Sequence, residues 1–150
     1  IRIARPVCKQ ITFESDPFIP GKANIMKNGK DVCIIACGLM MPIALEAAEK
    51  LTVEGIDAAV VNMHTIKPID KECILKMSRQ CKGIVTAEEH SVIGGLGSAV
   101  AGVLAAEGNT RMAMVGIEDK FGMSGKPADL FREYGLTAEH IVEECKALLN

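Results

Sequence analysis

The sequence predicts a three-layer, doubly wound α/β protein, with a mostly parallel sheet of about five strands and helices on both faces. Short, continuous apolar runs, typical of strands that are buried on both sides, alternate with segments whose apolar residues recur at helical spacing. The connections between these segments are short, as in doubly wound folds. One weaker strand segment, residues 23–28, is expected to form an antiparallel edge.

The first elements are predicted around the dipeptide Asn28-Gly29. This pair is a hairpin signal, because both central positions of the tightest hairpin turn need a positive φ. It separates the modest strand at 23–28 from a strong apolar strand at 32–37, so the sequence predicts a hairpin between the two.

Start and stop signals then mark the helices. Pro42 suits a first helical position and Gly55 a helix end, while Asp70 and Thr137 are residues that cap helix N-termini. The remaining strands are expected at 57–64, 83–89 and 111–118. The helices are expected at 42–55, 70–81, 97–107, 127–134 and 137–149.

Composition excludes several classes of function. The 150 residues are 49% hydrophobic and 24% charged, with a net charge of −2, four Phe, one Tyr and no Trp, so nucleic acid is not an expected partner. No apolar run approaches the roughly 20 residues that a membrane helix needs. The six cysteines lack CxxC spacing and fall mostly in apolar segments, which predicts reduced, buried thiols and a cytoplasmic protein.

The chain divides into two expected parts. Residues 1–20 contain prolines and show no clear period, so we interpret them as the tail of a preceding domain, with a short strand at 1–4. Residues 21–150 form the α/β domain. Because the sequence starts with Ile1 on a strand-like stretch, it is expected to be part of a longer protein.

The stretch Gly95-Leu96-Gly97 follows a strand and opens a helix, where backbone N–H groups attract anions. The dinucleotide fingerprint G-x-G-x-x-G is incomplete, because Val100 stands at its third glycine. We therefore expect a structural turn, with Gly95, Gly97 and Ser98 as a possible anion site. The loop Ser124–Lys126 also lacks the spacing of a phosphate loop.

Glu88, Glu89 and His90 end the strand before this turn. Neighbouring carboxylates and a histidine suit general acid/base catalysis, because each shifts the pKa of the others. The alternative is a strand end that faces solvent or a partner subunit. No nucleophile and no metal-ligand spacing lie nearby in the sequence, which favours the structural or interface role, with Glu89 and His90 as candidate interface residues.

Four stretches together resemble one family: "IRIAR", "GKDVCIIACGLMMPIALEAAEKLTVEGIDAAVVNMHTIKPID", "IVTAEEHSVIGGLGSAV" and "DKFGMSGKPADLFREYGLT". They are similar to the C-terminal domain of transketolase, including the split form whose C-terminal section is a separate polypeptide. The elements "TIKPID" and "GGLGS" are shared less closely with 1-deoxyxylulose-5-phosphate synthase and with the β subunit of 2-oxo-acid dehydrogenases. These two enzymes and a small phosphate- or nucleotide-binding module are the alternatives.

The resemblance implies an enzyme that uses thiamine diphosphate and Mg²⁺ to move a two-carbon ketol unit between sugar phosphates. It implies that the cofactor is bound by preceding catalytic domains or by a catalytic section, and not by this chain, which alone is expected to be inactive. The implied role of this domain is to support dimer assembly and the substrate channel. Arg5 matches the family's arginine that grips the substrate phosphate in the complete enzyme.

Overall fold

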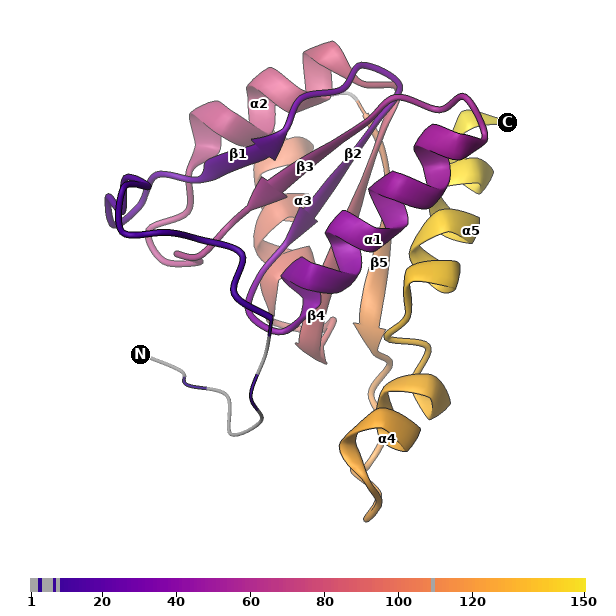
Figure 1. Ribbon diagram of the computed structural model, residues 1–150. Coiled ribbons are helices and arrows are strands. Elements are labelled where there is room, and N and C mark those ends of the chain that lie inside the picture. The colour runs from indigo at the N-terminus through magenta and orange to yellow at the C-terminus, as the bar shows by residue number, and fades with distance from the viewer. Residues whose placement is uncertain (1–2, 4–6, 8, 109) are drawn as a thin grey trace.

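The computed structural model describes residues 3, 7, 9–108 and 110–150, and it confirms the predicted class (Figure 1). Five strands form one sheet in the order β1-β3-β2-β4-β5. The pair β1–β3 is antiparallel, and the other neighbours are parallel. The strands are β1 (Asn24–Lys27), β2 (Val32–Ala36), β3 (Ala58–Asn62), β4 (Gly83–Ser91) and β5 (Arg111–Ile117).

Helices cover both faces of this sheet. Helices α1 and α5 pack together on one face, and α2 and α3 pack together on the other. The predicted caps are present, since Asp70 accepts a hydrogen bond from the Cys73 N–H and Thr137 accepts one from the His140 N–H. The helices are α1 (Met40–Val53), α2 (Lys71–Gln80), α3 (Leu96–Glu107), α4 (Pro127–Glu133) and α5 (Ala138–Leu149).

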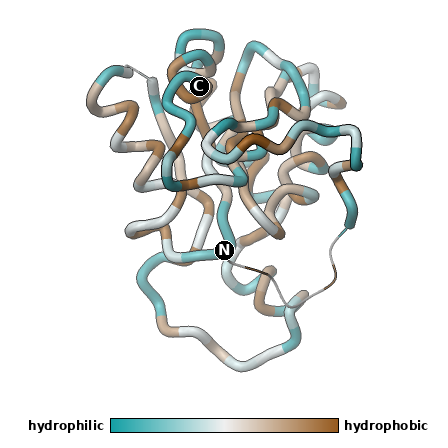
Figure 2. Tube along the Cα trace, turned by 90° about the vertical axis from the view of Figure 1, so that its left-hand side faces the viewer, coloured by the Kyte–Doolittle hydropathy of each residue, from teal (hydrophilic) through white to brown (hydrophobic). Residues whose placement is uncertain are grey.

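The apolar core lies on the two faces of the central strands. Every residue of β2 and β3 is buried, as expected for strands with helices on both sides. Along the chain trace, apolar segments alternate with hydrophilic turns (Figure 2). In the described part of the chain, no helix is long and apolar enough to cross a membrane. The strand expected at 1–4 falls mostly outside the described residues.

The predicted hairpin is wrong. Strand β1 pairs with β3 and not with β2, so the Asn28-Gly29 link crosses the start of β3 instead of turning back on itself. The Lys30 N–H and the Asp31 N–H both donate to the carbonyl of Asp57, at 3.0 and 2.9 Å. The glycine allows this crossing, because the backbones of Gly29 and β3 lie in direct contact. The Asn-Gly dipeptide is a local signal, so it cannot predict which distant strand pairs with β1.

The described cysteines form no disulfide with one another, and Cys33, Cys81 and Cys145 are buried. Burial raises the pKa of Cys73 and of Cys81 to about 11 and that of Cys145 to about 12, and it raises the pKa of Cys33 well above its ordinary value. An exposed thiol titrates near pH 8.5. The folded state therefore holds these protons more tightly than the unfolded state does, so the thiols are neutral and unreactive at neutral pH.

This difference predicts a loss of stability in alkali. The contribution of each thiol is complete below about pH 8.5 and falls by about 1.4 kcal/mol per pH unit as the pH rises toward the folded-state pKa. Between pH 8 and pH 10, the Cys145→Ala variant should therefore lose about 2 kcal/mol less stability than the parent chain. Urea unfolding of both proteins at the two pH values measures this difference. Equal losses would mean that Cys145 does not resist ionisation.

Candidate functional site

The carboxyl ends of the parallel strands form the edge of the sheet where ligands bind in doubly wound proteins. The winding of the chain reverses between β2 and β4, because α1 follows β2 onto one face and α3 follows β4 onto the other. The Cys37 N–H donates to the Ala87 carbonyl at 3.3 Å and joins the two strand ends. The glycine turn before α3 therefore lies at the expected position of a ligand site.

The side chain of Glu88 occupies the N-terminus of α3. It is 2% exposed, and its two carboxylate oxygens accept hydrogen bonds from the N–H groups of Leu96 and Gly97, at 2.7 and 2.8 Å. Helix N-termini carry partial positive charge and free N–H donors, so a carboxylate is well stabilised there. An external phosphate would have to displace this carboxylate from these two donors.

The glycines of the turn allow this arrangement. A Cβ atom on Gly95 would lie 2.0 Å from Oε2 of Glu88. A Cβ atom on Gly97 would lie 2.7 Å from Sδ of Met114 and 3.0 Å from Oγ1 of Thr86. The small residues thus let α3 approach β4 and β5 closely, which supports the interpretation of Gly95-Leu96-Gly97 as a structural turn.

The other predicted residues of this corner lie in different environments. The Ser98 hydroxyl accepts from the Gly94 N–H at 2.9 Å and donates to the Val92 carbonyl at 2.7 Å, so it stabilises the turn. Glu89 is half-buried. His90 is exposed, and its Nδ1 lies 3.0 Å from the Ser91 carbonyl oxygen. Both oxygens of Glu88 are hydrogen-bonded to the N-terminus of α3, so this carboxylate is not available as a general acid or base. This argues against the catalytic interpretation of the cluster. Arg5 lies outside the described residues.

Exposed apolar side chains occur in several loops at this carboxyl edge. They precede the antiparallel strand β1 or follow β3, β4 and β5, and we call them the carboxyl-edge apolar surface: Phe18, Ile19, Ile66, Ile93, Phe121 and Met123. The ring of Phe18 lies 4.5 Å from that of His64. Exposed apolar side chains at one edge of a domain are candidates for contacts with other proteins. Composition alone could not reveal it, since the loops come together only in the fold.

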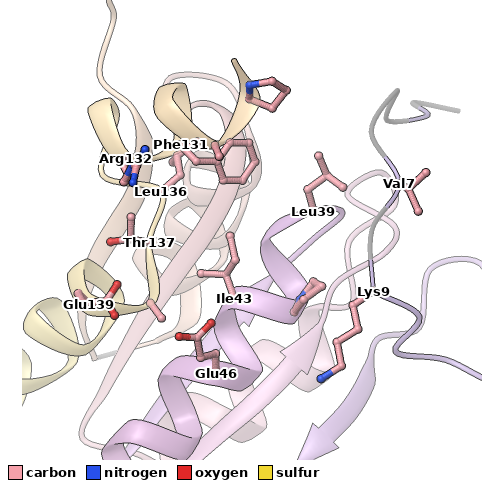
Figure 3. A pocket seen from close by; sticks show the side chains of 14 residues that line it. Val7, Lys9, Leu39, Ile43, Glu46, Phe131, Arg132, Leu136, Thr137 and Glu139 are labelled. Atoms are coloured by element: carbon pink, nitrogen blue, oxygen red, sulfur yellow. The ribbon is translucent and has the colours of Figure 1, made fainter. Parts of the chain in front are cut away.

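A pocket of about 500 Å³ opens beside this surface, between the N-terminal ends of α1 and α5, helix α4 and the N-terminal segment (Figure 3). Its lining is largely apolar and includes Leu39, Ile43, Phe131 and Leu136. Its charged lining residues are Lys9, Glu46, Arg132 and Glu139. Sequence reasoning missed this pocket, because its walls come from distant segments.

The residues described here do not fit a Mg²⁺–diphosphate site. Within residues 9–108 and 110–150, no group of three or more His, Cys, Asp or Glu side chains could hold a metal ion. The helix end that would attract a diphosphate at the switch point already binds the carboxylate of Glu88. At this edge of the sheet, the start of α3 is thus closely packed against β4, and exposed apolar side chains lie in the neighbouring loops.

Fold and edge together define an open, doubly wound α/β domain with exposed apolar side chains at the carboxyl edge of its sheet. Residues 21–141 match the family described as "Transketolase, C-terminal domain". The chain belongs to this family, whose members are parts of thiamine-diphosphate enzymes.

Individual relatives support this family assignment. The chain is 44% identical over 142 residues to the 6-deoxy-6-sulfo-D-fructose transketolase subunit SqwH of Clostridium sp. (strain MSTE9), covering 95% of this chain and 44% of the relative. It is 48% identical over 138 residues to a putative transketolase C-terminal section of Methanocaldococcus jannaschii, covering 89% of this chain and 43% of the relative.

A solved structure is also similar. The structure titled "Split gene transketolase, inactive beta4 tetramer" superposes with a TM-score of 0.93 at 46% identity, covering 97% of this chain and 48% of that chain. The chain therefore spans less than half the length of the relatives that it matches.

Proposed function

We propose that this chain is the non-catalytic C-terminal domain of a transketolase-type enzyme, which supports assembly of the dimer and the substrate channel. The complete enzyme would transfer a two-carbon ketol unit between sugar phosphates, with thiamine diphosphate and Mg²⁺ held by the catalytic domains. One observation carries the proposal: Glu88 fills the helix end where a phosphate would bind, while apolar side chains stay exposed on the same edge. This is the pattern of a domain that binds protein.

The relatives support a separate catalytic partner. Two of them are described as a transketolase subunit and as a transketolase C-terminal section, and the solved relative is described as an inactive assembly of one kind of subunit. By analogy, this chain would gain activity only with its catalytic section. In that complex, Arg5 would bind the phosphate of the sugar substrate.

Reconstitution tests this proposal. We expect no ketol transfer from the chain or from the catalytic section alone, and turnover of a ketose phosphate when the two are mixed with thiamine diphosphate and Mg²⁺. Calorimetric titration of thiamine diphosphate and Mg²⁺ into the chain alone should give no heat of binding. Turnover or micromolar cofactor binding by the chain alone would refute the proposal.

A second enzyme activity is supported by the identity to the 1-deoxy-D-xylulose-5-phosphate synthase of Heliobacterium modesticaldum, which is 43% over 131 residues. The reconstituted enzyme should therefore also be assayed for formation of 1-deoxy-D-xylulose 5-phosphate. Turnover of ketose phosphates without this product would support the transketolase activity. Formation of this product alone would support the synthase.

A further inference from the structure

The dipeptide Asn28-Gly29, which does not form the predicted hairpin, also has the chemistry of a deamidation site. Glycine after asparagine lets its backbone nitrogen reach the side-chain carbonyl carbon of the asparagine, because no Cβ atom obstructs the approach. Asn28 is exposed, and none of the described residues forms a hydrogen bond with its side-chain amide. Figure 1 shows this link between β1 and β2 at the end of the sheet away from α4, so it is remote from the candidate site.

Deamidation proceeds through a cyclic succinimide. The Gly29 nitrogen forms a bond to Cγ of Asn28 while the bond from Cγ to Nδ2 breaks, and Nδ2 leaves as ammonia with the proton of the Gly29 N–H. Water then hydrolyses the ring at one of its two carbonyl groups. Attack at Cγ gives an ordinary aspartate at position 28. Attack at the main-chain carbonyl gives isoaspartate, whose main chain runs through Cβ and Cγ and is therefore longer.

The fold holds Gly29 tightly. Gly29 is buried, and its carbonyl accepts a hydrogen bond from Nε2 of Gln80 at 2.6 Å. A Cβ atom on Gly29 would lie 2.3 Å from backbone atoms of Ala58 and of Ala59, so the main chain has little room to rotate here. Closing the succinimide ring requires rotation of the main chain between Asn28 and Gly29. The ring therefore cannot close while Gly29 is packed against β3.

The residues on either side of the dipeptide are also fixed to β3 and to the segment before it. Lys27 pairs with Val60 in the antiparallel ladder. The N–H groups of Lys30 and Asp31 both donate to the carbonyl of Asp57. Because the main chain is held before and after the reacting bond, deamidation has to wait until these contacts open.

Strand β1 is the element through which the link can open. It has four residues, lies at the edge of the described sheet next to β3, and pairs irregularly with β3 between Ile25 and Lys27. All residues of β1 are at least partly exposed. Segments with few buried contacts open at a lower free energy than the core of a protein does. Detachment of β1 can thus free the link while β2 and β3 stay folded.

We propose that Asn28-Gly29 is a deamidation site that the native fold keeps closed and that opening of β1 makes reactive. The loss of ammonia makes the conversion irreversible. In the isoaspartate product, the longer main chain does not fit the close contact between Gly29 and β3, so β1 closes less well than before. Each opening of β1 therefore gives some chains that have lost this closure, and the modified chains accumulate with the age of the protein.

Conversion rates of the folded and the unfolded chain test this proposal. The parent chain is incubated at one mildly alkaline pH with and without guanidinium chloride, and mass-spectrometric peptide mapping follows aspartate and isoaspartate at position 28. We expect the folded chain to react at least about 100-fold more slowly, because only its open fraction reacts. Asn24 is the internal control, since the branched side chain of Ile25 after it obstructs ring closure and should keep it intact.

A pair of glutamine variants tests whether the contacts of Gly29 close the site. Gln80→Ala removes the hydrogen bond to the Gly29 carbonyl and should raise the rate in the folded chain about fivefold, without changing the rate in guanidinium chloride. Gln10→Ala is the matched control, because the exposed Gln10 bonds to the nearby Thr12 carbonyl and should leave both rates unchanged. Circular dichroism confirms that both variants are folded.

The modified chain is then compared with Asn28→Asp, which carries the added charge on an ordinary main chain. The purified isoaspartyl chain should unfold at a lower concentration of guanidinium chloride than the parent, and Asn28→Asp should unfold like the parent. The proposal is overturned by equal rates in the folded and the unfolded chain, by no conversion in the unfolded chain, or by a parental rate in Gln80→Ala. An isoaspartyl chain as stable as Asn28→Asp would overturn it as well.

Discussion

Replacing Glu88 with alanine is expected to lower the free energy of unfolding by about 4 kcal/mol. The substitution leaves the buried N–H groups of Leu96 and Gly97 without an acceptor, at about 1–3 kcal/mol each. It also removes a negative charge from the N-terminus of α3 and opens a cavity. Urea unfolding followed by circular dichroism measures the change.

Two further variants separate the causes. Glu88→Gln keeps the shape and one acceptor oxygen but places an amide donor against a backbone N–H, so it should lose about half as much stability. Glu107→Gln, at the exposed C-terminal end of the same helix, should change stability by less than about 0.5 kcal/mol. If the free energy of unfolding of Glu88→Ala lies within about 1 kcal/mol of that of the parent chain, the carboxylate does not stabilise the N-terminus of α3.

The fold class could be predicted from the sequence because it depends on local periodicity. The buried strands β2 (Val32–Ala36) and β3 (Ala58–Asn62) lie within continuous apolar runs of the sequence, and the caps Asp70 and Thr137 satisfy donors within their own helices. The order of the strands depends on contacts between distant segments, and for this reason the hairpin prediction at Asn28-Gly29 failed.

The candidate site could be predicted only in part. Gly95-Leu96-Gly97 lies at the start of α3, after β4, as the sequence predicts, because glycines between a strand and a helix are a local signal. The role of Glu88 was missed, since its partners lie eight and nine residues later and no spacing rule connects them. The pocket was missed as well, because residues that line it, such as Leu39 and Phe131, lie far apart in the sequence.

Replacing Gly29 with alanine is the second substitution with a large expected effect, a loss of about 3 kcal/mol or more in the free energy of unfolding. A Cβ atom at this position would lie 2.3 Å from the carbonyl carbon of Ala58 and 2.3 Å from the amide nitrogen of Ala59. These are backbone atoms of a fully buried strand, so they can move only if β3 moves with them. The carbonyl of Gly29 also accepts a hydrogen bond from Gln80 at 2.6 Å, which would be strained by the shift.

Gly102→Ala is the matched control, because it adds the same methyl group inside helix α3, where nothing beyond the helix's own backbone lies within 4 Å of the new Cβ in the described part of the chain. Alanine is favoured over glycine in a helix by up to about 1 kcal/mol, so this variant should be as stable as the parent chain or more stable. The two substitutions should change stability in opposite directions. Gly29 lets its backbone contact that of β3, whereas Gly102 lies in a helix with space for a methyl group. Thermal and urea unfolding of both variants measure the pair. Equal effects at the two positions would show that the link between β1 and β2 does not cross β3 in close contact.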